Sequence, residues 1–175
     1  MTLVIAACAS SPDDGGVVPP AASGRAIPSK VGIVERNKSE TLPRGGGVVH
    51  RYRDGRFRPD VFLYEKDGAG STRTQAYEFI ESLKFQRVFG RSDAFRVVLD
   101  EPIRATIHEQ TYEGHEIVAQ IRGRGQWYDT YFSVIALPDE FVKFRITQPR
   151  GDQTPVRSRE FVQGWLTAYL AGEDQ

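Results

Sequence analysis

The stretch from residue 127 to residue 147, WYDTYFSVIALPDEFVKFRIT, constrains the fold more than any other part of this chain. Its Pro138-Asp139 pair is typical of a tight turn, because proline presets φ and aspartate hydrogen-bonds its own backbone. Before the turn both alternating faces are mostly apolar, which predicts an interior strand covered on both sides. After it, apolar residues alternate with Lys143, Arg145 and Thr147, which predicts one mainly wetted face. We expect the sheet and its helices to assemble around this hairpin.

Length and composition favour a single domain with a tail. The chain has 175 residues, of which 39% are hydrophobic, and this is enough for one core. Its 23 basic and 23 acidic residues balance, so net charge does not argue for a nucleic-acid partner. The single cysteine, Cys8, excludes an intrachain disulfide and a cysteine-based zinc site. No stretch approaches the ~18 to 20 apolar residues that span a membrane.

The N-terminal residues carry the most specific motif. Ile5-Ala6-Ala7-Cys8 resembles the lipobox of bacterial lipoproteins, in which the signal peptide is removed before a cysteine that receives a diacylglycerol. The resemblance implies that residues 1–7 are a truncated signal peptide and that Cys8 is the lipidated mature N-terminus. No Lys or Arg precedes Cys8, so we expect the true start to lie upstream of Met1. The alternative is a chance apolar start followed by a free thiol.

Residues 8–26 are interpreted as the lipid anchor and a flexible linker. Pro, Gly, Ser and Ala dominate this segment and no periodicity is present. As a flexible coil it would average on the order of 25 Å end to end, which keeps the following domain near the membrane. Ala9 and Ser10 follow the cysteine. In the lipoprotein family, that pattern implies the periplasmic face of the outer membrane if the source is Gram-negative.

Residues 27–172 are predicted to form one domain, and its first half contains strands and a helix. A short strand is expected at 31–34 and a loop at 37–47. Asp54-Gly55 is a strong hairpin signal between strands at 48–53 and 60–66. A helix is predicted over 72–89, because Ala76, Phe79, Ile80 and Leu83 recur at helical spacing before Gly90.

The second half is expected to contain three further pieces besides the central hairpin. A strand at 95–99 is predicted to be interrupted by Asp100-Glu101-Pro102, and a hairpin of 105–112 and 115–122 is predicted to turn at Glu113-Gly114. A last helix is predicted from Thr154-Pro155 to about residue 170. The order β-β-α-β-β-β-β-α predicts an α+β domain, with two helices on an antiparallel sheet of about six strands.

Residues 27–170 also resemble a family of uncharacterised secreted bacterial proteins. The resemblance rests on Ile27-Pro28, Val31-Gly32, Glu35-Arg36, Tyr52 and the strand Asp60-Val61-Phe62-Leu63-Tyr64. It implies an architecture similar to the PsbP-like α/β/α sandwich. Known members of that fold mostly bind or assist other proteins, and the resemblance brings no catalytic residue and no cofactor.

One surface feature suggests binding. Arg51, Arg53, Arg56 and Arg58 cluster at the tip of the first hairpin, with Tyr52 and Phe57 between them. Basic and aromatic interleaving can bind nucleic acid, but an envelope address excludes that partner in favour of lipid phosphates or an acidic protein. The alternative is a charged strand edge that deters aggregation.

The sequence gives little support for a catalytic site or a metal site. His108 and His115 flank a predicted hairpin turn, and a metal site there would need Glu109 or Glu116 as a third ligand. We favour exposed hairpin histidines, and we interpret Asp100 and Glu101 as turn formers. No serine lies in a Gly-x-Ser-x-Gly motif. The sequence therefore predicts a non-enzymatic, lipid-anchored binding or assembly module of the cell envelope. The alternatives are a small-ligand carrier or sensor with a pocket between sheet and helix, and an enzyme.

Overall fold

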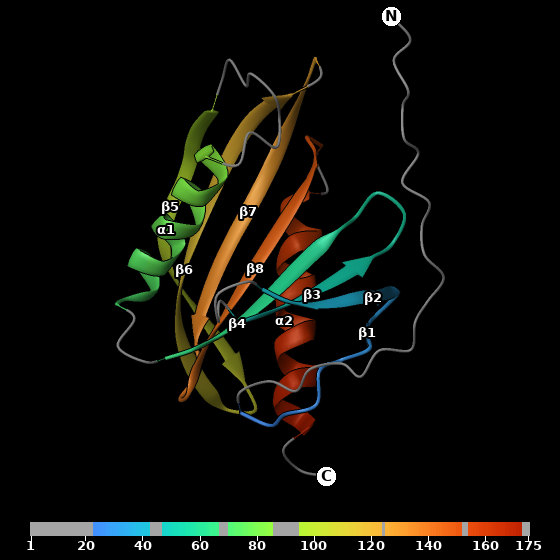
Figure 1. Cartoon of the computed structure of the whole chain (residues 1–175), viewed down its shortest axis with the longest axis vertical. Coiled ribbons are helices and arrows are strands. Elements are labelled where there is room, and N and C mark those ends of the chain that lie inside the picture. The colour runs from blue at the N-terminus through green and yellow to red at the C-terminus, as the bar shows by residue number, and fades with distance from the viewer. Residues whose placement is uncertain are drawn as a thin grey trace, which may run out of the picture.

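The chain folds into one antiparallel sheet with a helix on each face (Figure 1). The structure is a computed structural model that describes residues 23–42, 47–66, 70–85, 95–123, 125–151 and 154–172. The sheet has eight strands in the order β1-β2-β3-β4-β8-β7-β6-β5. Two groups of sequential strands, β1 to β4 and β5 to β8, therefore meet where β4 pairs with β8 in the middle of the sheet.

The elements have the following bounds. The first group contains β1 (Lys30–Val31), β2 (Val34–Thr41), β3 (Val48–Arg53) and β4 (Pro59–Glu65). Helix α1 (Thr72–Phe85) leads to β5 (Phe95–Ile107), β6 (Gln110–Gly123), β7 (Gln126–Ala136) and β8 (Glu140–Pro149). Helix α2 (Thr154–Ala171) ends the fold.

The predicted fold class is wrong in its strand count, because the sheet has eight strands and not about six. The short strand expected at 31–34 is in fact two strands, β1 and β2, and β2 runs on through residues 34–41. Part of the predicted loop at 37–47 is thus a strand. This segment, VERNKSET, is polar because β2 lies near the edge of the sheet, where backbone pairing with β3 needs no apolar side chains.

The hairpin between β5 and β6 turns at a different place from the predicted one. His108 and Glu109 form the turn with φ values of 47° and 66°, and Glu113-Gly114 lies within β6. Asp100-Glu101-Pro102 does not interrupt β5. Gly114 does not form a turn but allows close packing within the sheet. An added Cβ would lie 2.6 Å from Ile135 Cδ1 and 2.7 Å from the Val134 carbonyl oxygen.

The central hairpin of β7 and β8 is confirmed, with Pro138-Asp139 between the strands. One face of β8 was expected to be mainly wetted, and this expectation is wrong at Lys143, which is 6% exposed. Its Nζ lies 4.1 Å from the centre of the Tyr64 ring and donates to Gln75 Oε1 of α1 at 2.6 Å. Burial lowers the pKa of Lys143. Helix α1 covers this part of β8, which strand alternation alone cannot reveal.

Helix α2 packs the larger core. Trp165 is fully buried, and its indole stacks on Tyr169 with ring centres 4.6 Å apart. Its Nε1 donates to the Tyr52 hydroxyl at 2.7 Å, and that hydroxyl donates to the Pro28 carbonyl oxygen at 2.7 Å. Burial raises the pKa of Tyr52 to about 12, so the hydroxyl keeps its proton. These contacts join α2, β3 and the segment before β1.

That N-terminal segment is part of the packed structure from Ser23 onward. The Arg25 guanidinium lies 3.1 Å from Oε1 of Glu140, a carboxylate that is fully buried. Tyr169 donates its hydroxyl to the same oxygen at 2.6 Å, and Ser23 contacts both groups. A charge removed from water needs such partners. Residues assigned to the predicted linker therefore neutralise a buried charge at the start of β8.

Helix α1 packs a smaller core on the other face. Ser71 caps its start by accepting a hydrogen bond from the Thr74 amide at 3.2 Å. Ala76 and Ile80, two of the apolar residues with the predicted helical spacing, are buried against residues of β6 and β7. The side chains of Phe79 and Leu83, and residues 86–90 of the predicted helix, lie outside the described residues.

Candidate binding site

The predicted lipidation site, Cys8, lies outside the described residues. Within the part of the chain that the structure describes, no helix is both long enough and apolar enough to cross a bilayer. Cys8 therefore stays a prediction. The predicted arginine site can be placed residue by residue.

The hairpin tip between β3 and β4 is held firmly. Asp54 and Phe57 exchange two backbone hydrogen bonds of 2.9 Å across Gly55 and Arg56, and Gly55 has a φ of 55°. A two-residue turn with glycine at its first central position suits the twist of a hairpin. Phe57 is buried against Phe161 of α2. The Arg157 guanidinium lies 4.3 Å from the Phe57 ring centre and pairs with Asp54, so α2 fixes the tip.

All four predicted arginines are exposed, and Arg51, Arg53 and Arg58 share one face of the hairpin. Arg51 and Arg53 share a face by strand alternation, whereas Arg56 lies in the turn. Arg51 pairs in register with Asp60, and Asp54 with Phe57. The same register places Arg53 directly opposite Arg58. Two cations thus face each other across the hairpin, on the side of the sheet that carries α1.

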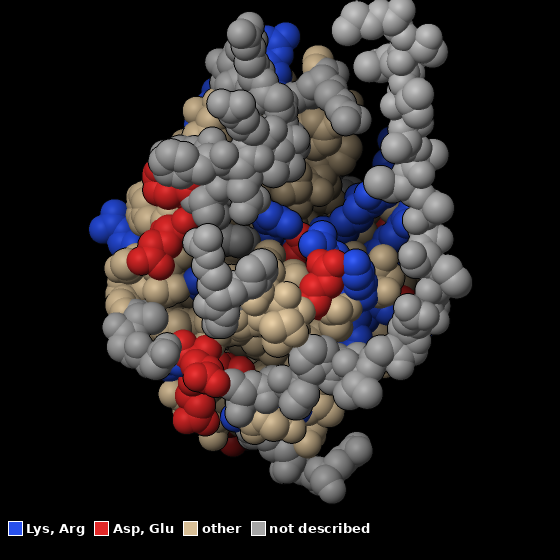
Figure 2. All heavy atoms as spheres, viewed as in Figure 1, with Lys and Arg blue, Asp and Glu red and all other residues tan. Residues whose placement is uncertain are grey.

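The register adds two cations that the sequence prediction missed. Lys38 of β2 is the register partner of Arg51, and Arg145 of β8 is the partner of Asp60. A row of Lys38, Arg51, Asp60 and Arg145 therefore crosses four strands. We define the basic face as the five cations of this row and the pair beside it: Lys38, Arg51, Arg53, Arg58 and Arg145. In Figure 2, Lys and Arg atoms gather over β3, β4 and β8, beside α1.

Part of the basic face is internally paired. Arg51 donates to Glu40 Oε2 from Nε at 3.1 Å and from Nη2 at 2.8 Å, and Lys38 pairs with the same carboxylate. The hydrogen bond from Lys38, followed by that from Arg51, lowers the pKa of Glu40. Arg145 pairs with Asp60.

Arg53 and Arg58 differ from the other three cations. Glu35, the register partner of Arg53, pairs with Lys30 at 3.0 Å. Neither arginine makes an ion pair with any residue of the described ranges. Two like charges that face each other across strands repel. Arg53 and Arg58 are therefore the cations of this face that are most available to an external anion.

The histidines are arranged differently from the prediction. His108 is exposed in the turn, whereas His115 lies within β6 and is 5% exposed. Its Nε2 lies 2.5 Å from Asp100 Oδ1, and Tyr77 of α1 donates to Asp100 Oδ2. The hydrogen bond from Tyr77, followed by that from His115, lowers the pKa of Asp100.

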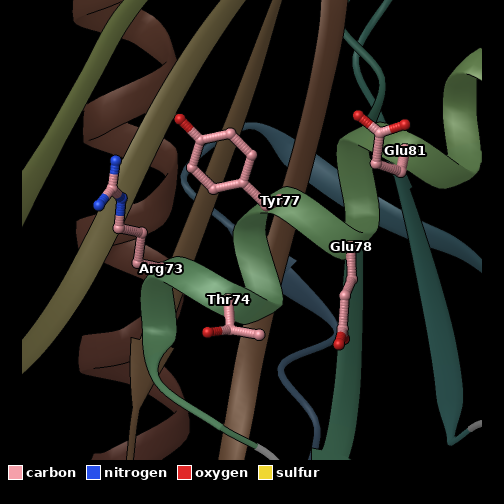
Figure 3. A pocket seen from close by; sticks show the side chains of 5 residues that line it. All are labelled: Arg73, Thr74, Tyr77, Glu78 and Glu81. Atoms are coloured by element: carbon pink, nitrogen blue, oxygen red, sulfur yellow. The ribbon is translucent and has the colours of Figure 1, made fainter.

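Of these residues, Tyr77 also lines a hollow on the surface of α1. Its volume is about 560 Å³, and Figure 3 shows the Arg73 and Tyr77 side chains pointing the same way, with Glu78 turned elsewhere. The Arg73 guanidinium lies 5.5 Å from the Tyr77 ring centre and 3.6 Å from Asp100. Asp100 thus links β5 to α1 through its contacts with Tyr77 and Arg73. Its interpretation as a turn former is wrong. The described residues contain no group of three His, Cys, Asp or Glu side chains that could hold a metal ion.

A second surface lies on the opposite face of the sheet. A groove of about 750 Å³, here called the α2 groove, separates α2 from β5, β6 and β7. Glu101 and Glu116 are register partners in its wall, and Ser133 is the next residue across the sheet. Arg159 of α2 contacts Glu116 at 2.7 Å and Glu101 at 3.6 Å. The sequence prediction named a pocket between sheet and helix but none of these residues as its lining.

A comparison with protein-family models gives no match, and a comparison with curated proteins gives no significant match. The resemblance of residues 27–170 to secreted bacterial proteins therefore stays a prediction.

Proposed function

We propose that this protein is a non-catalytic binding module that docks its basic face on an anionic membrane surface. The observation that carries the proposal is the cross-strand pair of Arg53 and Arg58, two exposed cations with no ion-pair partner among the described residues. Flanking cations on the same sheet face, Lys38, Arg51 and Arg145, are paired with carboxylates and extend the row across four strands. Each such cation near an anionic bilayer adds about 1 kcal/mol of attraction.

The proposal includes an anchor at Cys8 and a location in the cell envelope. Fourteen residues separate Cys8 from Ser23, where the described structure begins, and they span at most about 50 Å when extended. An anchor at Cys8 would therefore keep the basic face within reach of lipid headgroups. In cells, Cys8→Ala should move the protein from the membrane fraction to the soluble fraction. A Cys8→Ala protein that stays in the membrane fraction would contradict the anchor.

The docking surface can be tested separately from the anchor. The full chain carrying Cys8→Ser is mixed with neutral phosphatidylcholine vesicles or with vesicles that also contain phosphatidylglycerol. We expect binding to the anionic vesicles only, and a steep loss of binding as salt rises, because exposed charges are screened. Arg53→Gln/Arg58→Gln should weaken binding by on the order of tenfold or more and flatten the salt dependence.

The matched control is Arg104→Gln/Arg122→Gln, which removes two exposed arginines outside the basic face. This control should bind the anionic vesicles nearly as well as the parent chain. An equal loss in the control would show that only net charge matters. Absence of vesicle binding, together with Arg53-dependent binding of polyglutamate, would replace the membrane with an acidic protein as the partner.

A second function, the carriage or sensing of a small ligand, is favoured by one observation. The α2 groove lies between sheet and helix and combines apolar walls with a buried carboxylate, Glu116, which is 3% exposed. Concave sites of this volume with a few convergent polar groups are typical of ligand pockets.

A further inference from the structure

The α2 groove has a charged end and an apolar body. At one end Arg159 reaches the carboxylates of Glu101 and Glu116. At the other, Gln163 Nε2 donates to the Thr106 carbonyl oxygen at 3.2 Å. Between these two contacts lies the register row of Ile103, Gly114 and Ile135. Ile135 and Ile103 pack over Gly114, where an added Cβ would lie 2.6 Å and 3.0 Å from their side chains, so these two isoleucines form the apolar wall of the groove.

The charged end is short of positive charge. Glu101 and Glu116 face each other directly across β5 and β6, and like charges in that position repel. One guanidinium, that of Arg159, serves both carboxylates. Glu160 and Arg104 also border the groove, but strand alternation directs the Arg104 side chain to the opposite face of the sheet. The side chains that face the groove therefore carry three negative charges against one positive charge.

Arg159 is itself a loosely held partner. Its side chain is 59% exposed, whereas the Glu116 side chain that it contacts is 4% exposed. A buried carboxylate requires a cation, but that cation need not belong to the chain. An external ammonium group could take the place of the guanidinium, since Arg159 can swing into water at little cost.

The remainder of the groove suits an aliphatic chain. Beyond the carboxylates the lining is Ile103, Ala105, Ile135 and Val162, with Gly164 of α2 above them. We propose that the α2 groove binds a small aliphatic ammonium ion. Its charged end replaces Arg159 between Glu101 and Glu116, and its stem lies along the apolar side chains of Ile103, Ile135 and Val162. This inference rests on the small-ligand function and is independent of the basic face.

Calorimetric titration of the full chain with n-hexylammonium tests the proposal, with hexanol and hexanoate as probes of matched length. We expect hexylammonium to bind, hexanol to bind at least about tenfold more weakly, and hexanoate not to bind. Hexanol or hexanoate binding as tightly as hexylammonium would overturn the proposal. So would the absence of hexylammonium binding up to about 10 mM, the weakest affinity that a specific site of this kind should have.

Two variants separate binding from a structural role of Arg159. Arg159→Gln removes the internal competitor and should raise the affinity for hexylammonium by about tenfold, whereas Glu116→Gln should lower it by at least about tenfold. Glu113→Gln, which neutralises an exposed carboxylate of the same strand, is the matched control and should change nothing. An affinity that Arg159→Gln lowers or leaves unchanged would overturn the proposal, because Arg159 would then not be a competitor.

Thermal unfolding of each variant establishes that it is folded before titration. Ala105→Leu offers a second route, because it fills the stem region without touching a charge and should weaken hexylammonium binding. Binding that survives both Ala105→Leu and Glu116→Gln would place the cation outside the groove. Vesicle binding by the basic face should be the same in all these variants, so failure here is distinguishable from failure of the membrane proposal.

Discussion

The two faces of the sheet differ in the size of their apolar core and in their exposed charge. On the face that packs against α2, apolar residues from both groups of strands join Trp165, Tyr169 and Phe161 in one core. On the other face, α1 covers a smaller core over β6 and β7, and the cations of the basic face lie beside it. The larger apolar core therefore lies on the α2 face and the exposed cations lie on the α1 face, because a sheet face that no helix covers can keep charges in water.

The two cores can be compared most directly by truncating one buried helix side chain in each. Trp165→Ala should lower the free energy of unfolding by about 3 to 5 kcal/mol, because it leaves a cavity and removes the hydrogen bond to Tyr52. Ile80→Ala on the α1 face should cost less, about 2 to 3 kcal/mol. Urea denaturation of both variants measures the two losses. An Ile80→Ala loss equal to or larger than that of Trp165→Ala would contradict this difference between the cores.

Lowering the pH should reduce the stability of the protein through His50, which is buried on the α2 face. This side chain is fully buried, its Nδ1 lies 2.8 Å from the Ser39 hydroxyl, and burial followed by the Arg36 charge lowers its pKa to about 4. The unfolded chain binds the proton at its ordinary pKa of ~6.5, so stability should fall as pH drops from 6.5 to 4. The full loss is roughly 3 kcal/mol.

Unfolding experiments at pH 7 and pH 4.5 check this prediction. His50→Gln should reduce the difference in unfolding free energy between the two pH values, whereas His108→Asn, at an exposed turn position, should not. An unchanged pH dependence in His50→Gln would mean that His50 is not the titrating group.

Two adjacent residues of β6, one on each face of the sheet, allow a further comparison of the two faces. Gly114→Ala should cost about 1 to 3 kcal/mol, because its Cβ would overlap Ile135 and the Val134 carbonyl oxygen. Glu113→Ala, next to it on the opposite face and exposed, should change stability by less than about 0.5 kcal/mol. Thermal melts of the two variants give the contrast, and equal shifts would show that the strand is not packed tightly at Gly114.

The smallest effects are expected on the basic face. Arg53→Gln/Arg58→Gln should leave stability within about 0.5 kcal/mol or raise it slightly at low salt, since it removes a repulsion. Arg51→Gln should lower stability by at most about 0.5 kcal/mol through loss of its exposed contact with Glu40. Denaturation at low and high salt measures both. A loss above 1 kcal/mol in the double variant would show that Arg53 and Arg58 support the fold.

The sequence predicted the elements that have a clear local signal. The hairpin of β7 and β8, the turn after Asp54 and helix α2 all follow from periodicity and turn residues. The β5–β6 turn was mispredicted, because glycine usually marks turns but Gly114 instead makes room for Ile135. The actual turn, His108-Glu109, has positive φ values at two residues that rarely adopt them, so no local signal indicated it.

By itself, the sequence determined what depends on near neighbours: alternation, helical spacing, turns and the density of arginines at the first hairpin tip. Only the tertiary structure decided which distant residues meet. Strand register placed Lys38 and Arg145 in one row with Arg51. Helix α1 placed Tyr77 on the Asp100–His115 pair, and α2 placed Arg159 over two opposed carboxylates. The physical reason is that alternation is a property of one strand, whereas the partner of a strand is chosen by the packing of the whole sheet and its helices.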